Sequence, residues 1–108
     1  MAWSVLILNA AVEKELAALP DEMQARFQQA AGLIREFGLQ AVREPLVKHL
    51  RGPLWEIRIR GRDGISRALY VAATGQRVVV VRVFVKKTQK TPGDEIALAL
   101  KRAKEIDR

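Results

Sequence analysis

The sequence contains no cysteine, one histidine and one tyrosine. Without cysteine, disulfide bonds, zinc sites built from thiolates and cysteine nucleophiles are all excluded. With His49 alone, a pair of histidines acting as acid and base, as in many ribonucleases, is impossible. The sequence also lacks acidic clusters with metal-ligand spacing, a glycine-rich phosphate loop and a serine–histidine arrangement. An enzyme made from these residues would act through basic groups, and we expect neither a metal nor a cofactor.

Long hydrophobic runs are lacking as well. The longest nearly uncharged run near the start, residues 2–12, is too short to span a bilayer and has no basic start of the kind found in signal peptides. We therefore expect a soluble, cytoplasmic protein that does not contact membranes. A length of 108 residues with 49% hydrophobic residues suits one domain, residues 1–108, with one packed core.

The positive charge is confined to one part of the chain. The net charge is −2 over residues 1–42, +9 over residues 43–90 and zero over residues 91–108, which sums to +7. A stretch with this excess attracts polyanions and speeds encounter with them. The alternative interpretation is a basic surface that only keeps the protein in solution.

Hydrophobic periodicity predicts an α+β fold with the order β-α-α-β-β-β-α. The first strand, residues 3–8, precedes two helices that Asn9 and Asp21 cap, and Gly38 ends the second helix. Residues 39–53 are expected to connect this helical hairpin to an antiparallel meander. The strands of the meander are predicted at residues 54–60, 66–73 and 77–86, the last being the most apolar and therefore central. Thr91 is predicted to cap a final helix.

The alternation of side chains along the strands predicts a basic sheet face. Arg58 and Arg60 point to one side of their strand. In the last strand the odd-numbered valines from Val79 to Val85 share one face, and Arg82, Phe84 and Lys86 share the opposite face. Arginine is costly within a valine-rich strand unless it is solvated or paired, so Arg82 indicates a working surface. The candidate RNA contacts and catalytic residues are Arg58, Arg60, Arg67, Arg82, Phe84, Lys86, Lys87 and Lys90.

Cations of this kind neutralise phosphates, and an aromatic ring among them offers a stacking surface to an unpaired base. Phe84 is the candidate for stacking, although a place in the core is the alternative. A lone histidine such as His49 is more often an ordinary surface residue than a functional one.

Three segments carry a resemblance to a known family. The first is Leu-Trp-Glu-hydrophobic-Arg at residues 54–58, the second is Arg67 followed by Tyr70, and the third is Phe-x-Lys-Lys-Thr-x-Lys-Thr-Pro-x-x-Glu-Ile at residues 84–96. Together they resemble the phage-related branch of the RelE/ParE toxin superfamily, close to HigB. The resemblance implies a RelE-like fold, in which a helical hairpin packs on one face of a mainly antiparallel sheet.

The resemblance also implies a function and a set of residues. Several toxins of the superfamily enter the ribosomal A site and cleave mRNA, without a metal, by attack of the RNA's own 2′-hydroxyl group. By position, Arg67 matches an arginine that contacts the scissile phosphate, Lys86 and Lys87 match a catalytic basic pair, and Arg58 matches a further basic position. Crowding among cations favours a neutral lysine that could act as the base, without indicating which one.

The chain departs from its relatives at two places. They often have His-x-Phe where this chain has Arg82, Val83 and Phe84, and some carry a tyrosine near the C-terminal end that is missing here. Both differences remove candidates for proton transfer or stacking. The alternatives are therefore a ParE-like gyrase poison, a binding protein that sequesters its antitoxin, and a phage structural or accessory protein.

The resemblance implies protein partners too. Toxins of this branch are usually encoded beside a helix-turn-helix antitoxin that also binds operator DNA. We expect such an antitoxin as a partner, together with the ribosome and mRNA, and operator DNA only through the antitoxin.

Overall fold

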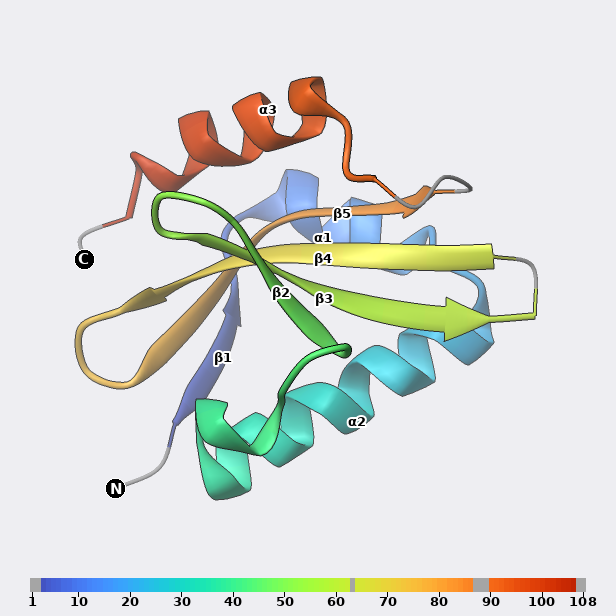
Figure 1. Ribbon diagram of the computed structural model, residues 1–108, viewed down its shortest axis with the longest axis horizontal. Coiled ribbons are helices and arrows are strands. Elements are labelled where there is room, and N and C mark those ends of the chain that lie inside the picture. Colours follow the sequence, from blue (N-terminus) through green and yellow to red (C-terminus); the bar gives the residue numbers. More distant parts are fainter. Residues whose placement is uncertain (1–2, 63, 87–89, 107–108) are drawn as a thin grey trace.

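The computed structural model describes residues 3–62, 64–86 and 90–106 of the chain (Figure 1). The elements in chain order are β1 (Ser4–Ile7), α1 (Ala10–Ala17), α2 (Asp21–Phe37), the 3₁₀ turn η1 (Leu39–Ala41), β2 (Val47–Arg51), β3 (Leu54–Gly61), β4 (Gly64–Ala73), β5 (Arg77–Lys86) and α3 (Gly93–Ala103). Over the ranges described, none of the helices combines the length and apolar character needed to cross a membrane.

A single five-stranded sheet is formed by the described strands, in the order β1-β5-β4-β3-β2. Strands β3, β4 and β5 form the predicted antiparallel meander, whereas β1 pairs in parallel with the first half of β5. The α+β fold class is therefore confirmed. Strand β5 is an interior strand, flanked by β1 and β4, in agreement with its apolar character, and β4 occupies the middle position of the sheet.

Strand β2 was not predicted. It falls within residues 39–53, where the prolines and Gly52 suggested a connecting segment, and it is only five residues long. It pairs with β3, so that Lys48 lies opposite Glu56 and His49 opposite Trp55. The turn between the two strands uses Gly52 at a φ of 54°, a conformation that glycine adopts without steric cost.

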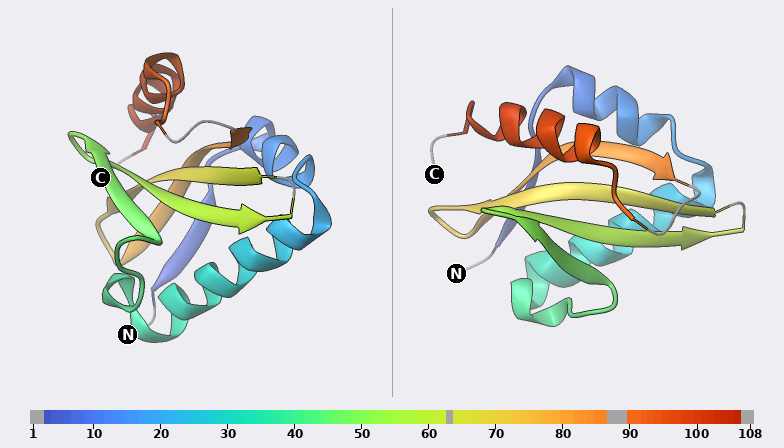
Figure 2. Two further views of the ribbon diagram at one scale, coloured as in Figure 1. Left: turned by 45° about the vertical axis from the view of Figure 1, so that its right-hand side comes forward. Right: turned by 45° about the horizontal axis from the view of Figure 1, so that its top comes forward.

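Helices lie on both faces of the sheet (Figures 1 and 2). The predicted apolar stripe of α2 packs against Ile57 and Ile59 of β3 and against parts of β4 and β5. On the other face α3 covers a second cluster, in which Ile96, Ala99 and Ala103 are buried. The hairpin therefore packs as expected, but α3 covers much of the face that was expected to be exposed.

The helix ends agree with the sequence at two positions and differ at two. Asn9 caps α1, since its side chain accepts a hydrogen bond from Val12 N at 3.1 Å, and Gly38 ends α2 at a φ of 88°. The predicted caps Asp21 and Thr91 were wrong. Pro20 and Pro92 occupy those positions, and the hydroxyl of Thr91 is used elsewhere.

A β-bulge in β5 changes which side chains share a face. Leu69 pairs with Arg82, but the next residue of β4, Tyr70, pairs with Val80, so β5 contains one extra residue. The alternation therefore shifts by one position: Val79 and Val81 pack under α3 together with Phe84, whereas Val83 packs with the helical hairpin. The predicted common face for the odd-numbered valines was wrong because periodicity alone does not show a bulge.

Candidate nucleic-acid interface

Cross-strand registers assemble the basic residues of β3 and β4 on the face that α3 partly covers. One row consists of Arg60, Ile65 and Lys86, and the next consists of Arg58, Arg67 and Phe84. Residues directly opposite each other in an antiparallel pair project to the same side of the sheet. Each row therefore places side chains from three neighbouring strands side by side.

Beyond the edge of α3 this face is hollowed. A cavity of about 280 Å³, which we call the cationic hollow, is lined by Lys48, Arg58, Arg60, Ile65, Arg67 and Lys90. Lys48, Arg60 and Lys90 are exposed, Arg58 is half-buried, and Arg67 is 1% exposed at the floor. The sequence predicted four of these five cations as RNA contacts or catalytic residues. Their roles in binding or catalysis stay predictions.

The floor of the cationic hollow is organised by one buried carboxylate. Glu56 is 0% exposed, and its Oε2 accepts hydrogen bonds from Arg67 Nη1 at 2.6 Å and from Arg58 Nε at 3.1 Å. Its Oε1 accepts from the hydroxyl of Thr91, which itself accepts from Arg67 Nη1 at 3.3 Å. A buried charge is tolerated only when it is paired and hydrogen-bonded, as Glu56 is. Sequence reasoning did not select Glu56 or Thr91.

Arg82 does not reach the cationic hollow, which corrects the expectation of one exposed basic face. Its guanidinium forms ion pairs with Glu15 of α1 at 2.8 Å and with Glu95 of α3 at 2.7 Å. The hydrogen bond from Arg82 to Glu95 and the charge of Glu15 raise the pKa of Arg82. The arginine is tolerated in this strand because it is paired.

Arg102 of α3 completes the same cluster. It forms an ion pair with Glu15 at 2.9 Å and donates a hydrogen bond to the carbonyl oxygen of Val81 at 2.9 Å. Burial of Glu15 opposes ionisation, but hydrogen bonds from Arg102 and the Val83 N–H, with the charge of Arg82, lower the pKa of Glu15 overall. We call Glu15, Arg82, Glu95 and Arg102 the helix junction, because they join α1 and α3 to β5.

Phe84 is a core residue. It is 9% exposed and packs in the cluster under α3, with the Arg82 guanidinium 5.5 Å from the centre of its ring. The alternative of a core position, left open by the sequence, is the one observed, so the described conformation does not present the ring as a stacking surface. The bulge in β5 and the packing of α3 on this face together explain why Phe84 is buried.

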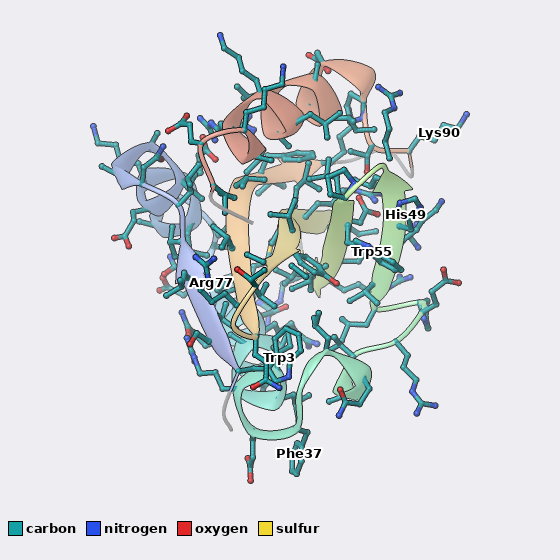
Figure 3. All side chains as sticks on the ribbon, turned by 90° about the vertical axis from the view of Figure 1, so that its left-hand side faces the viewer. Trp3, Phe37, His49, Trp55, Arg77 and Lys90 are labelled. Carbon is teal, nitrogen blue, oxygen red and sulfur yellow. The ribbon has the colours of Figure 1, made fainter. Side chains whose placement is uncertain are left out.

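The predicted basic pair at the end of β5 is described in part. Lys86 is half-buried and pairs with Ile65, which places it at the flank of the cationic hollow. Lys87 lies outside the described residues. Lys90 and His49 both lie on the β2 side of the molecule, and Arg77 lies on the β1 side (Figure 3).

Lys48 is the contributor to the hollow that sequence reasoning missed. It belongs to β2, which was expected to be a connecting segment, and its register with Glu56 places it on the basic face. No sequence signal identifies Lys48, because the five residues Val47–Arg51 are too few to show a strand period and their burial does not alternate.

The remaining candidates for proton transfer lie away from this site. His49 is on the opposite face of β2, where its ring contacts Trp55 at 5.0 Å between centroids and its Nε2 lies 2.8 Å from the carbonyl oxygen of Gly52. Tyr70 is 3% exposed on the hairpin side, and burial raises its pKa to about 12. Among the described residues, no cluster of three or more histidine or acidic side chains could hold a metal ion.

Comparison with known proteins supplies the family and the fold. The profile of the family described as "Phage derived protein Gp49-like" matches residues 14–104. No curated protein matches the chain significantly.

Two solved structures are similar over most of their length. One is a free-state mutant of the E. coli toxin RelE in which two arginines are replaced by alanine. It is 20% identical, with a TM-score of 0.68 over 94% of this chain and 98% of that chain. The other is the archaeal RelE–RelB complex from Pyrococcus horikoshii, 23% identical, with a TM-score of 0.58 over 79% of this chain and 96% of that chain.

Similarity at this level of identity establishes a shared fold, and the family match covers most of the sequence. The phage-related family and the RelE-like fold that the sequence motifs implied are thereby confirmed. The chain belongs to the family of Gp49-like phage-derived proteins and has the fold of the RelE toxins.

Proposed function

We propose that this protein is the toxin of a toxin–antitoxin pair and that it cleaves mRNA on the ribosome without a metal ion. The observation that carries the proposal is the cationic hollow, in which five cations from β2, β3, β4 and the segment before α3 surround one cavity. A cavity of this composition suits the phosphates of a single RNA strand. The RelE fold supports the same proposal.

The proposed reaction needs charge stabilisation above all. The RNA's 2′-oxygen attacks the adjacent phosphorus, loses its proton and forms a 2′,3′-cyclic phosphate, while the bond from phosphorus to the 5′-oxygen breaks and that oxygen gains a proton. Negative charge builds up on the pentavalent phosphate, and preorganised cations lower the barrier by stabilising it. In the proposal Arg67 and Arg58 perform this role, with Lys86 at the flank and Lys87 as further catalytic candidates.

The surrounding exposed cations bind the RNA on either side of the scissile phosphate. Arg60, Lys48 and Lys90 lie at the rim of the hollow, where they can contact phosphates without prior rearrangement of the core. Arg82 and Phe84 have no part in this proposal, since one belongs to the helix junction and the other to the core.

The proposed partners follow from the family. An antitoxin, of the helix-turn-helix type and able to bind operator DNA, would hold the toxin inactive, and the ribosome would present the mRNA in the cytoplasm. The complex of RelE with RelB is the related assembly that supports an antitoxin partner.

The test compares Arg60→Ala with Arg35→Ala. Arg60 is exposed and lines the hollow, whereas Arg35 is exposed on α2 and lines none of the described cavities, so both variants should fold. Induced in cells, the wild type and Arg35→Ala should arrest growth and leave cut mRNA, and Arg60→Ala should do so more weakly. Purified Arg60→Ala should also bind single-stranded RNA with a log–log salt slope that is shallower by about 0.7. Equal mRNA cleavage by all three proteins would refute the site.

A second candidate function is supported by one observation. In the described part of the chain the hollow contains cations and a carboxylate already engaged by three donors, while His49 and Tyr70 lie elsewhere. Such a surface binds polyanions or an acidic protein without needing to cleave RNA. Growth arrest with intact mRNA would favour this function, and DNA breaks would favour a gyrase poison.

A further inference from the structure

Two motifs that are far apart in the sequence meet at one hydrogen bond. Glu56 belongs to the Leu-Trp-Glu motif of β3, and Thr91 belongs to the Lys-Thr-Pro motif before α3, 35 residues later. Neither residue is a cation, so neither attracts a phosphate by its own charge. Their contact lies at the floor of the cationic hollow, beside Arg67.

Placing Glu56 there is energetically expensive. The carboxylate is 0% exposed, so its hydration is lost completely. Apolar residues of similar volume often replace buried ion pairs without loss of stability. Stability alone therefore gives little reason for a buried carboxylate at this position, and the geometry that its bonds impose is the feature to explain.

Glu56 fixes the orientation of two arginines through one oxygen atom. It holds Arg58 by Nε, the nitrogen nearest the main chain, and it holds Arg67 by Nη1. Within the described ranges the distal amino groups of Arg58 form no hydrogen bond or ion pair, and Arg58 lines the hollow. We call these bonds of Glu56, together with the one from Thr91, the clasp. By holding Arg58 at Nε, the clasp sets the direction in which the distal amino groups of Arg58 point, and these are the groups available to a phosphate.

Through its second oxygen Glu56 holds the segment that carries Lys90. The bond from Thr91 anchors the chain immediately before α3 to β3, and Lys90 is the next residue toward β5. Lys90 lines the hollow from this segment. One carboxylate therefore links β3, β4 and the segment before α3, which together carry four of the five cations of the hollow.

We propose that Glu56 and Thr91 are positioning residues, which set the geometry of Arg58, Arg67 and Lys90 for a phosphate without touching it. This inference rests on the proposed function in so far as the phosphate belongs to RNA. The clasp itself is a property of the protein and is testable without RNA.

The experiment removes one hydroxyl group and then restores it. Thr91→Val keeps the shape of the side chain but cannot hydrogen-bond, whereas Thr91→Ser keeps the hydroxyl. With a short single-stranded RNA as the probe, Thr91→Val should bind about five- to tenfold more weakly, which is the size of effect expected for the loss of one typical hydrogen bond. Its log–log salt slope should be shallower by about 0.7, because Lys90 no longer contacts a phosphate. Thr91→Ser should restore both quantities.

The matched control is Thr74→Val. The exposed Thr74 hydroxyl lies 3.5 Å from Arg77 Nη2 at the turn between β4 and β5, far along the strands from the hollow. This variant also removes a threonine contact with an arginine, and its RNA affinity and salt slope should equal those of the wild type. A fall in melting temperature for Thr91→Val with unchanged affinity and slope would show a merely structural role and overturn the proposal.

A second measurement separates this inference from the proposed function. In ¹⁵N NMR spectra of the free protein, the Nε–H signals of Arg58 and Arg67 should shift and exchange faster with water in Thr91→Val, and should return in Thr91→Ser. If the wild type fails to bind RNA while these signals respond as expected, the proposed function fails and the clasp stands. If the signals are the same in all variants, the clasp is refuted whatever the RNA result.

Discussion

In the described part of the chain, two clusters each have one glutamate that holds two arginines, and the two clusters have different structural roles. At the cationic hollow Glu56 holds Arg58 and Arg67 on the sheet, next to a cavity. At the helix junction Glu15 holds Arg82 and Arg102 between α1, β5 and α3. The same chemistry thus organises a cavity in one place and fastens helices in the other.

The difference lies in what surrounds each pair. Glu56 is enclosed, and the cations beside it outnumber it, so the site as a whole attracts anions. At the helix junction two glutamates balance two arginines, and the Val81 carbonyl and Val83 N–H satisfy further groups. An arginine in a strand therefore indicates an anion site only when the charges around it remain unbalanced.

The largest effect is expected from Glu56→Ala. Removing the carboxylate leaves Arg67 as a buried charge without its main partner, which typically costs about 3–5 kcal/mol of unfolding free energy. Denaturant unfolding of the purified protein measures this loss. A change below about 1 kcal/mol would mean that water or another group replaces Glu56 as the partner of Arg67. The cationic hollow and the helix junction would then not differ in how strongly their glutamates contribute to stability.

A smaller loss is expected from Glu15→Ala. Its side chain is 15% exposed, Arg82 keeps Glu95, and Arg102 keeps the carbonyl of Val81. Partial solvation and the remaining partners limit the cost to about 1–2 kcal/mol in the same unfolding experiment. RNA binding should be unaffected, since none of these residues lines the hollow. Weaker RNA binding at equal stability would show that the two clusters are coupled.

Local patterns made much of the fold predictable. The alternation in β3 and the helical spacing in α2 depend only on neighbouring residues, and both segments were predicted within a residue or two of their bounds. The same alternation brought Arg58 and Arg60 to one face, and the register with β4 added Arg67 to them. These parts of the candidate site needed no knowledge of distant contacts.

The features that could not be predicted from the sequence depend on contacts between segments that are far apart in the chain. The partner of Arg82 in α1 lies more than half the chain away from it, and the bulge opposite Leu69 is invisible in a run of valines. Strand β2 is too short to show a period, so Lys48 could not be assigned to the basic face. Periodicity predicts which side of a strand a residue occupies, but not what covers that side.

The pH dependence of stability offers a finer test of the helix junction. The pKa of Glu15 is lowered from its ordinary value of 4.5, so the unfolded chain takes up the proton first as the pH falls. The stability contributed by Glu15 is therefore fully present above pH 4.5 and is lost as the pH falls through the folded-state pKa. Its ionised form is held by Arg102, Arg82 and the Val83 N–H, with Glu95 as the neighbouring acid.

Glu15→Gln should consequently be less stable than the wild type above pH 4.5, and the gap should narrow at lower pH. The matched control is Glu13→Gln, on the exposed side of the same helix and without an ion pair among the described residues, whose unfolding free energy should run parallel to that of the wild type. Unfolding free energies measured from pH 3 to pH 7 check both variants. A constant gap for Glu15→Gln would mean that its contacts depend on shape and not on charge, because only a contribution from the ionised carboxylate disappears on protonation.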